Sequence, residues 1–278
     1  MERDAIFQNL QKDENGVFLA PENAALSYPE EGNALFFGLE DRSFWFQHRN
    51  DVIAAAVMSF PPAPQDFLLD IGGGNGFVTR RLLDEGFSAV LLEPGRTGAR
   101  NAKMERNIPR VLCATLEQSG IPEESMGAVG CFDVLEHVEE DKAFLSSMAK
   151  ILKPGGMFYL TVPAGPWLWS HTDIYSGHYR RYGKFSLLAV LGEDFEPLYY
   201  TCFFGWLVLP LFFLKALPSR LGLLKRENVF SHETEHGADS KIVSPLMRFL
   251  LRKEIAMIRK GKSKSWGTSC LLVARRRG

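Results

Sequence analysis

The sequence predicts an α/β fold in which a mostly parallel sheet carries helices on both faces. The first observation is a short apolar run at 67–71, which ends in the glycine-rich turn GGGNG and leads into apolar residues at helical spacing. The second is that short apolar runs and helix-like segments alternate along the chain from this point on. Such alternation gives parallel strands joined by right-handed crossovers, so a layer of helices is expected on each face of the sheet.

The same patterns place the individual elements and the domain boundary. The expected strands are 67–71, 88–92, 109–113, 127–132, 156–162, 194–201 and 269–274. The expected helices are 49–59, 75–85, 96–106 and 139–152, with a basic amphipathic helix at 245–260. We expect an N-terminal helical cap at 1–65 and one domain at 66–278, which insertions at 164–184 and 202–263 interrupt.

The glycine turn is suited to a ligand, and its surroundings favour one class of ligand over another. The dinucleotide fingerprint Gly-x-Gly-x-x-Gly requires a glycine at position 77, where this chain has Phe77. Asp70, at the end of the preceding strand, would repel a pyrophosphate and attract an ammonium group. Glu93, at the end of the next apolar run, can accept hydrogen bonds from two ribose hydroxyls in either class. Together these residues fit S-adenosylmethionine better than NAD.

Four segments of the chain resemble the motifs of a known family. In order and spacing, LLDIGGGNG, LLEPG, CFDVLEHVEED and LKPGGMFYLTVP are similar to those of class I S-adenosylmethionine-dependent methyltransferases. The resemblance covers about residues 66–200 and the last strand, and it implies a Rossmann-like sheet of seven strands with the last one antiparallel. An FWF leader at 44–46 and a GHYRRY loop at 177–182 are similar to one bacterial subgroup, which is often associated with surface-glycan and lipid pathways.

The resemblance also implies which residues bind the methyl donor. Asp70 and the turn would hold its methionine part, and Glu93 its ribose. The expected cofactor-binding residues are Asp70, Gly72, Gly73, Gly74, Gly76, Glu93, Pro94, Cys113, Ala114, Thr115, Phe132 and Asp133. The family usually has an acid near the adenine amino group, where this chain has Cys113, so backbone groups are expected to recognise the adenine. Glu136 and His137 are expected to support their loop rather than to act chemically.

The insertion at 164–184 is expected to meet the methyl acceptor, because ligands of open α/β sheets bind at the carboxyl ends of the strands. The candidate catalytic residues are His171, Asp173 and His178, since imidazoles beside a carboxylate can form a general base. The same residue types can bind a metal, but their spacing in this loop is a weak signal and no metal is expected. The candidate substrate-binding residues are Arg180, Arg181 and Tyr182. The alternative is a structural loop whose arginines pair with acidic residues of the first half of the chain.

Charge is distributed unevenly along the chain, although the net charge is only −1. Residues 1–150 hold 24 acids and 13 bases, whereas residues 151–278 hold 9 acids and 19 bases. The uncharged run at 202–214 is too short to span a bilayer, which takes about 20 residues. An apolar run of this kind within the basic second half of the chain is typical of an element that binds an anionic membrane surface. The alternative is that 202–214 is a helix of the core. Four well-separated cysteines and a polar N-terminus without a signal-like segment favour a cytoplasmic protein, and membrane association is expected only if the 202–214 run is not core.

The sequence therefore predicts methyl transfer from S-adenosylmethionine to an oxygen or nitrogen of a small-molecule, glycan or lipid-linked acceptor. Nucleic acid is not expected as a partner, because the run Asn/Asp-Pro-Pro-aromatic of amino-methylating enzymes is absent after the fourth strand. Two alternatives remain open at this point. One is a nicotinamide-dependent oxidoreductase, and the other is a non-catalytic nucleoside-binding protein of the same fold.

Overall fold

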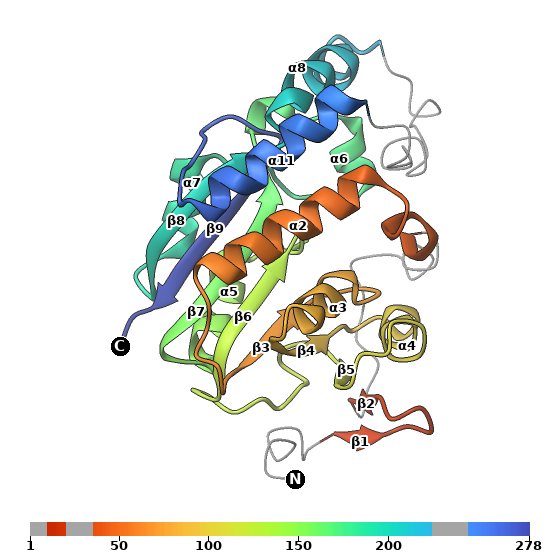
Figure 1. Ribbon diagram of the computed structural model, residues 1–278, viewed down its shortest axis with the longest axis vertical. Helices are drawn as coiled ribbons and strands as arrows, with labels where there is room; N and C mark the ends of the chain where they lie inside the picture. Colours follow the sequence, from red (N-terminus) through yellow and green to blue (C-terminus); the bar gives the residue numbers. More distant parts are fainter. Residues whose placement is uncertain (1–9, 21–35, 224–243) are drawn as a thin grey trace.

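One sheet runs through the whole protein in the computed structural model, which describes residues 10–20, 36–223 and 244–278 (Figure 1). The strands lie in the order β1-β2-β5-β4-β3-β6-β7-β9-β8. Their bounds are β1 Gln11–Lys12, β2 Phe18–Leu19, β3 Phe67–Ile71, β4 Ser88–Leu92, β5 Val111–Cys113, β6 Met126–Phe132, β7 Leu152–Pro163, β8 Phe195–Phe203 and β9 Ser269–Arg276. The five strands from β5 to β7 are parallel, and β9 is antiparallel to both β7 and β8.

All seven expected strands are present, and the antiparallel last strand is confirmed. The expected number of strands was wrong, because the sheet has nine. The two additional strands form a short hairpin in which β1 pairs with β2, and β2 pairs with the outer edge of β5. Each has only two residues, so neither leaves an alternating pattern that a sequence could show.

Helices cover both faces of the sheet, as expected. The longer ones are α2 Phe44–Ser59, α3 Phe77–Asp84, α4 Arg96–Met104, α5 Asp141–Ile151, α7 Lys184–Leu191 and α11 Pro245–Arg259. Alternate residues of each strand point to opposite faces. Leu69 and Ile71 of β3 pack in the core with α5 and α7, whereas Leu68 packs in the core with α2, α3 and α11. The helix α7 was not expected from the sequence.

The helix α2 lies beside α11 on one face of the sheet (Figure 1). It begins after Ser43, whose hydroxyl accepts a hydrogen bond from the Trp45 amide, and this places its start five residues before the expected one. The six residues 52–57 are completely buried in the core that contains Leu68 and Tyr159. The part of 1–65 that the structure describes thus packs on the sheet and along its edge, and the division of the chain at residue 65 stays a prediction.

The first insertion contains η3 Pro166–Leu168 and α6 His171–Tyr175. The second contains η4 Gly205–Leu207, α8 Val208–Leu211, the π-helical turn η5 Phe212–Ala216, α9 Leu217–Arg220 and α11. The helices α6 and α8 of the two insertions lie at one end of the molecule, whereas α11 of the second insertion lies beside α2 on the face of the sheet (Figure 1). Within the described residues, no helix combines the length and apolar character needed to cross a membrane.

Candidate functional site

The glycine turn between β3 and α3 has the backbone geometry that its sequence predicts. Gly72, Gly74 and Gly76 have φ angles of +68°, +55° and +79°, a region that side-chain-bearing residues rarely adopt. A Cβ atom on Gly73 would lie 2.2 Å from the Leu91 side chain and 2.7 Å from Asp70 Oδ2. Glycine at these positions therefore lets the backbone fold directly over the carboxylate of Asp70.

Asp70 is completely buried beneath this turn. Its Oδ2 accepts a hydrogen bond of 2.6 Å from the Thr79 hydroxyl, whereas its Oδ1 is buried without a hydrogen-bond partner among the described residues. Burial raises the pKa of Asp70 to about 6, although the bond from Thr79 and the positive charge of Arg49 oppose the shift. A buried carboxylate oxygen without a donor is costly, and a bound ammonium group would satisfy it.

Glu93, the residue expected to bind the ribose, connects the turn to the next strand. Its Oε2 accepts a hydrogen bond of 2.9 Å from the Gly74 amide, and its Oε1 accepts one of 2.8 Å from the Gly95 amide. Each carboxylate oxygen has two lone pairs, so each of the two oxygens can still accept a hydrogen bond from a ribose hydroxyl. Glu93 therefore has a structural role in the turn in addition to any role in binding.

The residues expected near the adenine lie at the end of β5, where the N-terminal hairpin joins the sheet. The Cys113 thiol lies 3.7 Å from the Pro94 carbonyl, and the Cys113 carbonyl accepts a hydrogen bond from the Ala20 amide. Ala114 is buried, and Thr115 exchanges hydrogen bonds with Gln118. The hairpin contact was not expected from the sequence.

At the end of β6, Asp133 forms an ion pair with Arg49 of α2. Arg49 also donates a hydrogen bond of 2.8 Å to the Phe132 carbonyl. Asp133 has a φ of +55°, and its amide is bonded to the Thr161 carbonyl of β7, so the strand end is fixed from two sides. Arg49 was expected only as the first residue of a helix, and its pairing with Asp133, 84 residues away, was not expected from the sequence.

The acceptor loop brings together two of the three candidate catalytic residues. Asp173 is 1% exposed, and it accepts bonds from His178 Nδ1 at 3.1 Å and Arg181 Nε at 2.6 Å. Burial raises the pKa of Asp173, but the bonds from His178 and Arg181 outweigh burial and hold it below its usual value. No described hydrogen bond joins the His171 side chain to this pair, and the His171 amide donates to the Ser219 hydroxyl.

The three candidate substrate-binding residues all contact protein groups. Arg181 pairs with Asp173, and Arg180 pairs with Asp141 at 2.6 Å. Tyr182 is 1% exposed and donates a hydrogen bond of 3.0 Å to Asp141. The Arg180 pair matches the structural alternative, because Asp141 lies in the first half of the chain, whereas Asp173, the partner of Arg181, belongs to the loop itself. Contact of these three residues with an acceptor stays a prediction.

Glu136 and His137, which follow β6 in η2 Leu135–His137, lie against the same loop. The Glu136 carbonyl accepts a hydrogen bond of 2.8 Å from the Tyr179 amide, and the His137 and His178 rings meet edge-on with centroids 4.8 Å apart. Burial, and then the nearby Asp133 carboxylate, raise the pKa of Glu136 well above its usual value. Burial, and then the His178 ring, lower the pKa of His137 to about 4.

A second acidic group, which the sequence analysis missed, lies beside the glycine turn. Glu40 is buried and accepts hydrogen bonds from Asn75 Nδ2 at 3.1 Å and from Arg106 at 2.8 Å. Asn75 in turn accepts one from Asn101 of α4. Burial raises the pKa of Glu40 to about 7. The only sequence signal for this network is the position of Asn75 between Gly74 and Gly76.

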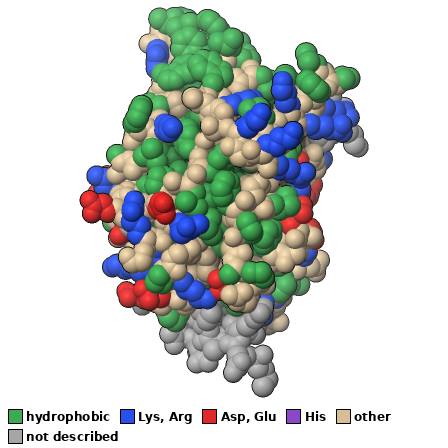
Figure 2. Space-filling view, turned by 60° about the vertical axis from the view of Figure 1, so that its left-hand side comes forward, with side chains coloured by type: hydrophobic (Ala, Val, Ile, Leu, Met, Phe, Trp, Pro, Cys, Tyr) green, Lys and Arg blue, Asp and Glu red, His purple; other side chains and the backbone are tan. Residues whose placement is uncertain are grey.

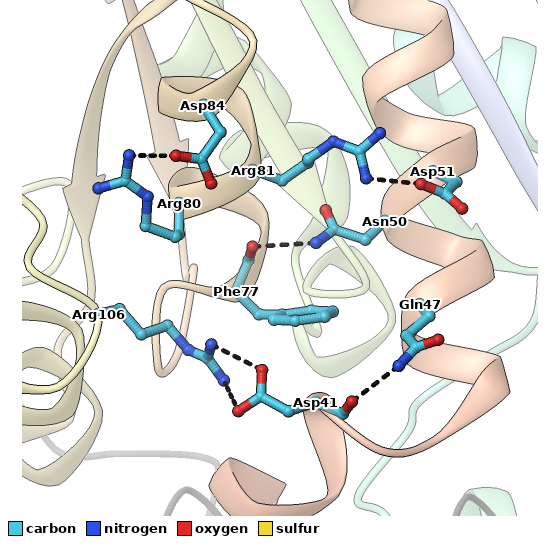
Figure 3. A pocket seen from close by; sticks show the side chains of 9 residues that line it. All are labelled: Asp41, Gln47, Asn50, Asp51, Phe77, Arg80, Arg81, Asp84 and Arg106. Carbon is cyan, nitrogen blue, oxygen red and sulfur yellow. Dashed lines mark hydrogen bonds and ion pairs between the residues drawn. The ribbon is translucent and has the colours of Figure 1, made fainter. Parts of the chain in front are cut away.

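A polar cavity of about 380 Å³ opens near the first residue of α3, between α2 and α3 (Figure 3). Figure 3 shows that Arg80, Arg81 and Arg106 each reach a carboxylate, of Asp84, Asp51 and Asp41 respectively. None of the expected cofactor-binding residues lines this cavity. Its charges are mutually compensated, and Arg106 connects it to Glu40 beside the glycine turn.

Comparisons with known proteins agree with this geometry. Residues 69–160 match the family model described as "Methyltransferase domain". A Mycolicibacterium smegmatis protein named as a probable S-adenosylmethionine-dependent methyltransferase is 28% identical over 146 residues, which are 51% of this chain and 55% of that protein. A ubiquinone biosynthesis O-methyltransferase of Rhodopseudomonas palustris is 31% identical over 104 residues, 36% of this chain and 41% of the relative. The chain thus spans about half or less of the length of these relatives.

Two solved structures resemble nearly the whole chain. The protein solved with the Trm112 methyltransferase activator of Haloferax volcanii has a TM-score of 0.58 at 16% identity, over 90% of this chain and 96% of that one. Phosphoethanolamine N-methyltransferase 2 of Haemonchus contortus, in complex with S-adenosyl-L-methionine, has a TM-score of 0.53 at 16% identity, over 91% of this chain and 58% of that one. These similarities establish a Rossmann-like methyltransferase fold. Membership of the subgroup with the FWF leader and the GHYRRY loop stays a prediction.

Proposed function

We propose that this chain, whose central segment is a class I S-adenosylmethionine-dependent methyltransferase domain, transfers a methyl group to an oxygen or nitrogen of an acceptor bound at the 164–184 loop. The observation that carries the proposal is the carboxylate of Asp70, which is buried beneath the glycine turn with Oδ1 lacking a donor among the residues that the structure describes. The methionine part of the methyl donor has an ammonium group, and this oxygen can accept a hydrogen bond from it. A dinucleotide would instead bring a pyrophosphate to the same carboxylate, where like charges repel.

Methyl transfer from a sulfonium requires little of the protein beyond positioning the donor and the acceptor in line. The backbone amides of the turn and the Glu93 carboxylate are suited to fix the nucleoside end. The ion pair between Arg49 and Asp133 holds the end of β6, which in this fold borders the methyl group. Because α2 carries Arg49, the N-terminal part of the chain contributes directly to the shape of the proposed site.

His178 is the group best placed to take a proton from the acceptor. Its Nδ1 is bonded to the buried Asp173, so Nε2 is the nitrogen that remains for another partner. A carboxylate that fixes one imidazole nitrogen also stabilises the protonated ring, and this arrangement is typical of a general base. The His178 side chain is 15% exposed, which leaves it reachable from outside.

The surface beside this loop supports an acceptor carried by a lipid. Phe213 and Leu214 of η5 are 57% and 69% exposed, and Leu246 and Phe249 at the start of α11 are 68% and 60% exposed. Figure 2 shows hydrophobic side chains gathered at the end of the molecule where α8 lies, with Lys and Arg side chains nearby. Exposed apolar side chains beside basic residues are suited to an anionic lipid surface. The other half of the 202–214 run is core, since Phe203 and Phe204 are buried.

A methyl-release assay tests the proposal. The protein is incubated with S-adenosylmethionine labelled in the methyl group, together with either the lipid fraction or the aqueous fraction of a bacterial extract. We expect label in a lipid-borne product with wild-type protein and a reduced yield with His178→Ala. Label only in an aqueous product would contradict the lipid-borne acceptor. Absence of transfer to either fraction, with S-adenosylhomocysteine still bound, would favour a non-catalytic binding protein.

A further inference from the structure

We infer that Glu136, His137 and His178 form a binding site for a divalent transition-metal cation. One ligand atom from each of these three residues lies within 4.8 Å of the other two. The cluster differs from the trio His171, Asp173 and His178, which the sequence suggested as catalytic residues, and no metal was expected from the sequence. It combines residues from two segments, one after β6 and one after β7, that the fold brings to the same edge of the sheet.

The two segments are held together independently of any ligand. The Tyr179 amide donates to the Glu136 carbonyl at 2.8 Å, and the Tyr182 hydroxyl donates to Asp141 at 3.0 Å. Arg180 adds a hydrogen bond of 2.7 Å to the Glu139 carbonyl. The three candidate ligands therefore sit on a fixed backbone, and a preformed site of this kind costs little ordering when a cation binds.

The charges around the cluster leave one carboxylate uncompensated. Arg49 pairs with Asp133, and Arg181 pairs with Asp173. Glu136 is 1% exposed, has no ion pair in the described residues, and its Oε2 has no hydrogen-bond partner there. A buried carboxylate in this state is unfavourable unless a proton or a cation neutralises it. A cation between Glu136 and the two imidazoles would do so and would also use the oxygen that lacks a partner.

The imidazoles are oriented as metal ligands usually are. His178 Nδ1 bonds to the Asp173 carboxylate, which is the common carboxylate–histidine–metal arrangement and directs Nε2 toward the cluster. The His137 ring meets the His178 ring edge-on, with centroids 4.8 Å apart. Two imidazole nitrogens and one carboxylate oxygen suit Zn²⁺, Mn²⁺, Co²⁺ or Fe²⁺ and leave coordination positions open. Ligand atoms of such sites lie about 3–4 Å apart, so a small side-chain rotation closes the observed separation.

His137 and His178 are only partly buried, so a cation bound there stays accessible from outside. If the proposed methyl transfer is correct, His178 Nε2 cannot act as the general base while it binds the cation, and an acceptor hydroxyl bound to the cation would then lose its proton to solvent more readily. This role rests on the proposed function, whereas binding of the cation does not.

Calorimetric titration of the metal-free protein with Zn²⁺, and the visible absorption of added Co²⁺, test the site. We expect one cation per chain with wild-type protein and at least about tenfold weaker binding with Glu136→Gln or His178→Asn. His171→Ala, in the same loop, is the matched control and should bind as wild type does. Glu136→Gln keeps the size of a buried side chain and removes its charge, so its melting temperature should not fall.

Several results would overturn the inference. They are no binding of Zn²⁺ or Co²⁺ by wild-type protein, full binding by folded Glu136→Gln and His178→Asn, or loss of binding in His171→Ala alone. S-adenosylhomocysteine is titrated into the same samples, so the two proposals fail separately. Binding of S-adenosylhomocysteine without binding of a cation would contradict the metal site and leave the proposed methyl transfer intact. Binding of a cation without binding of S-adenosylhomocysteine would contradict the proposed methyl transfer and leave the metal site intact.

Discussion

The carboxylate of Glu93 and the backbone amide of Gly74 are joined by a hydrogen bond of 2.9 Å. The acid that follows β4 thus holds the glycine turn that follows β3, and its other oxygen is bonded to the Gly95 amide. A residue that was expected to bind only the ribose therefore also shapes the part of the site expected to hold the methionine. Substitution of Glu93 should therefore weaken binding of the methyl donor in two ways, through the lost contact with the ribose and through the altered glycine turn.

Glu93→Ala is expected to weaken S-adenosylhomocysteine binding by about 1–3 kcal/mol, because the ribose hydroxyls and the Gly74 amide lose an acceptor. Calorimetric titration measures the change. Glu117→Ala, which removes an exposed acid one strand further along the chain, is the control and should bind as wild type does. Unchanged affinity in Glu93→Ala would remove Glu93 from the site.

Asp70→Asn is expected to stabilise the ligand-free protein at pH 7 while weakening S-adenosylhomocysteine binding. Burial raises the pKa of Asp70 from 3.8 to about 6, so the native protein binds this proton more tightly than the unfolded chain does. The free energy of unfolding should then fall as pH rises from about 4 to about 6, by about 2–3 kcal/mol. The free energy of unfolding of Asp70→Asn should not show this fall, because asparagine does not titrate.

Thermal unfolding at pH 4 and pH 7 measures the effect of Asp70→Asn. The gain in melting temperature over wild type should be larger at pH 7 than at pH 4. Glu123→Gln, at an exposed acid, should show no such difference. A variant that is less stable than wild type at pH 7 would show that the ionised carboxylate is satisfied in the native protein.

His178→Ala is expected to lower turnover by about 100-fold or more, because the proposed general base is lost. Affinity for S-adenosylhomocysteine should stay within about twofold of wild type, since His178 lies in the acceptor loop and not at the turn. Steady-state rates and calorimetric titration of the same preparation separate the two effects. Equal losses in turnover and cofactor affinity would instead mark the loop as purely structural.

Binding to anionic vesicles is expected to depend on the apolar side chains of η5. Wild-type protein should sediment with vesicles of phosphatidylcholine and phosphatidylglycerol at low salt and less at about 0.5 M salt, because each basic residue contributes about 1 kcal/mol that salt screens. Phe213→Ser with Leu214→Ser should weaken sedimentation. Phe185→Ser, at an 87% exposed phenylalanine of α7, is the control. Wild-type protein that stays in the supernatant at both salt concentrations would contradict the membrane proposal.

The strands could be predicted because each is a short apolar run with a sharp end. Residues 67–71 and 88–92 were expected with the bounds that β3 and β4 have, since both strands are buried on two faces and bounded by glycine or proline. The hairpin of β1 and β2 could not be predicted. Its two-residue strands are stabilised by pairing with β5 near Leu112, some 90 residues away, and not by a local pattern.

The glycine turn could also be predicted, because its backbone conformation requires glycine whatever surrounds it. The acceptor loop is different, since its candidate residues were chosen by side-chain type alone. The sequence does not show that Arg180 turns toward Asp141, or that Asp173 caps α6 through Ser170. Nor does it show that His178 lies beside His137, because this contact depends on how the segments after β6 and β7 meet in space.

Calorimetric titration with S-adenosylhomocysteine and, separately, with NAD tests the central claim most directly. Asp70, beneath the glycine turn, should accept a hydrogen bond from the ammonium group of S-adenosylhomocysteine. The same carboxylate should repel the pyrophosphate of NAD. We expect saturable binding of S-adenosylhomocysteine with one site per chain, a matching rise in melting temperature, and no heat of binding with NAD. Binding of NAD without binding of S-adenosylhomocysteine would contradict the account and return the chain to the oxidoreductase alternative.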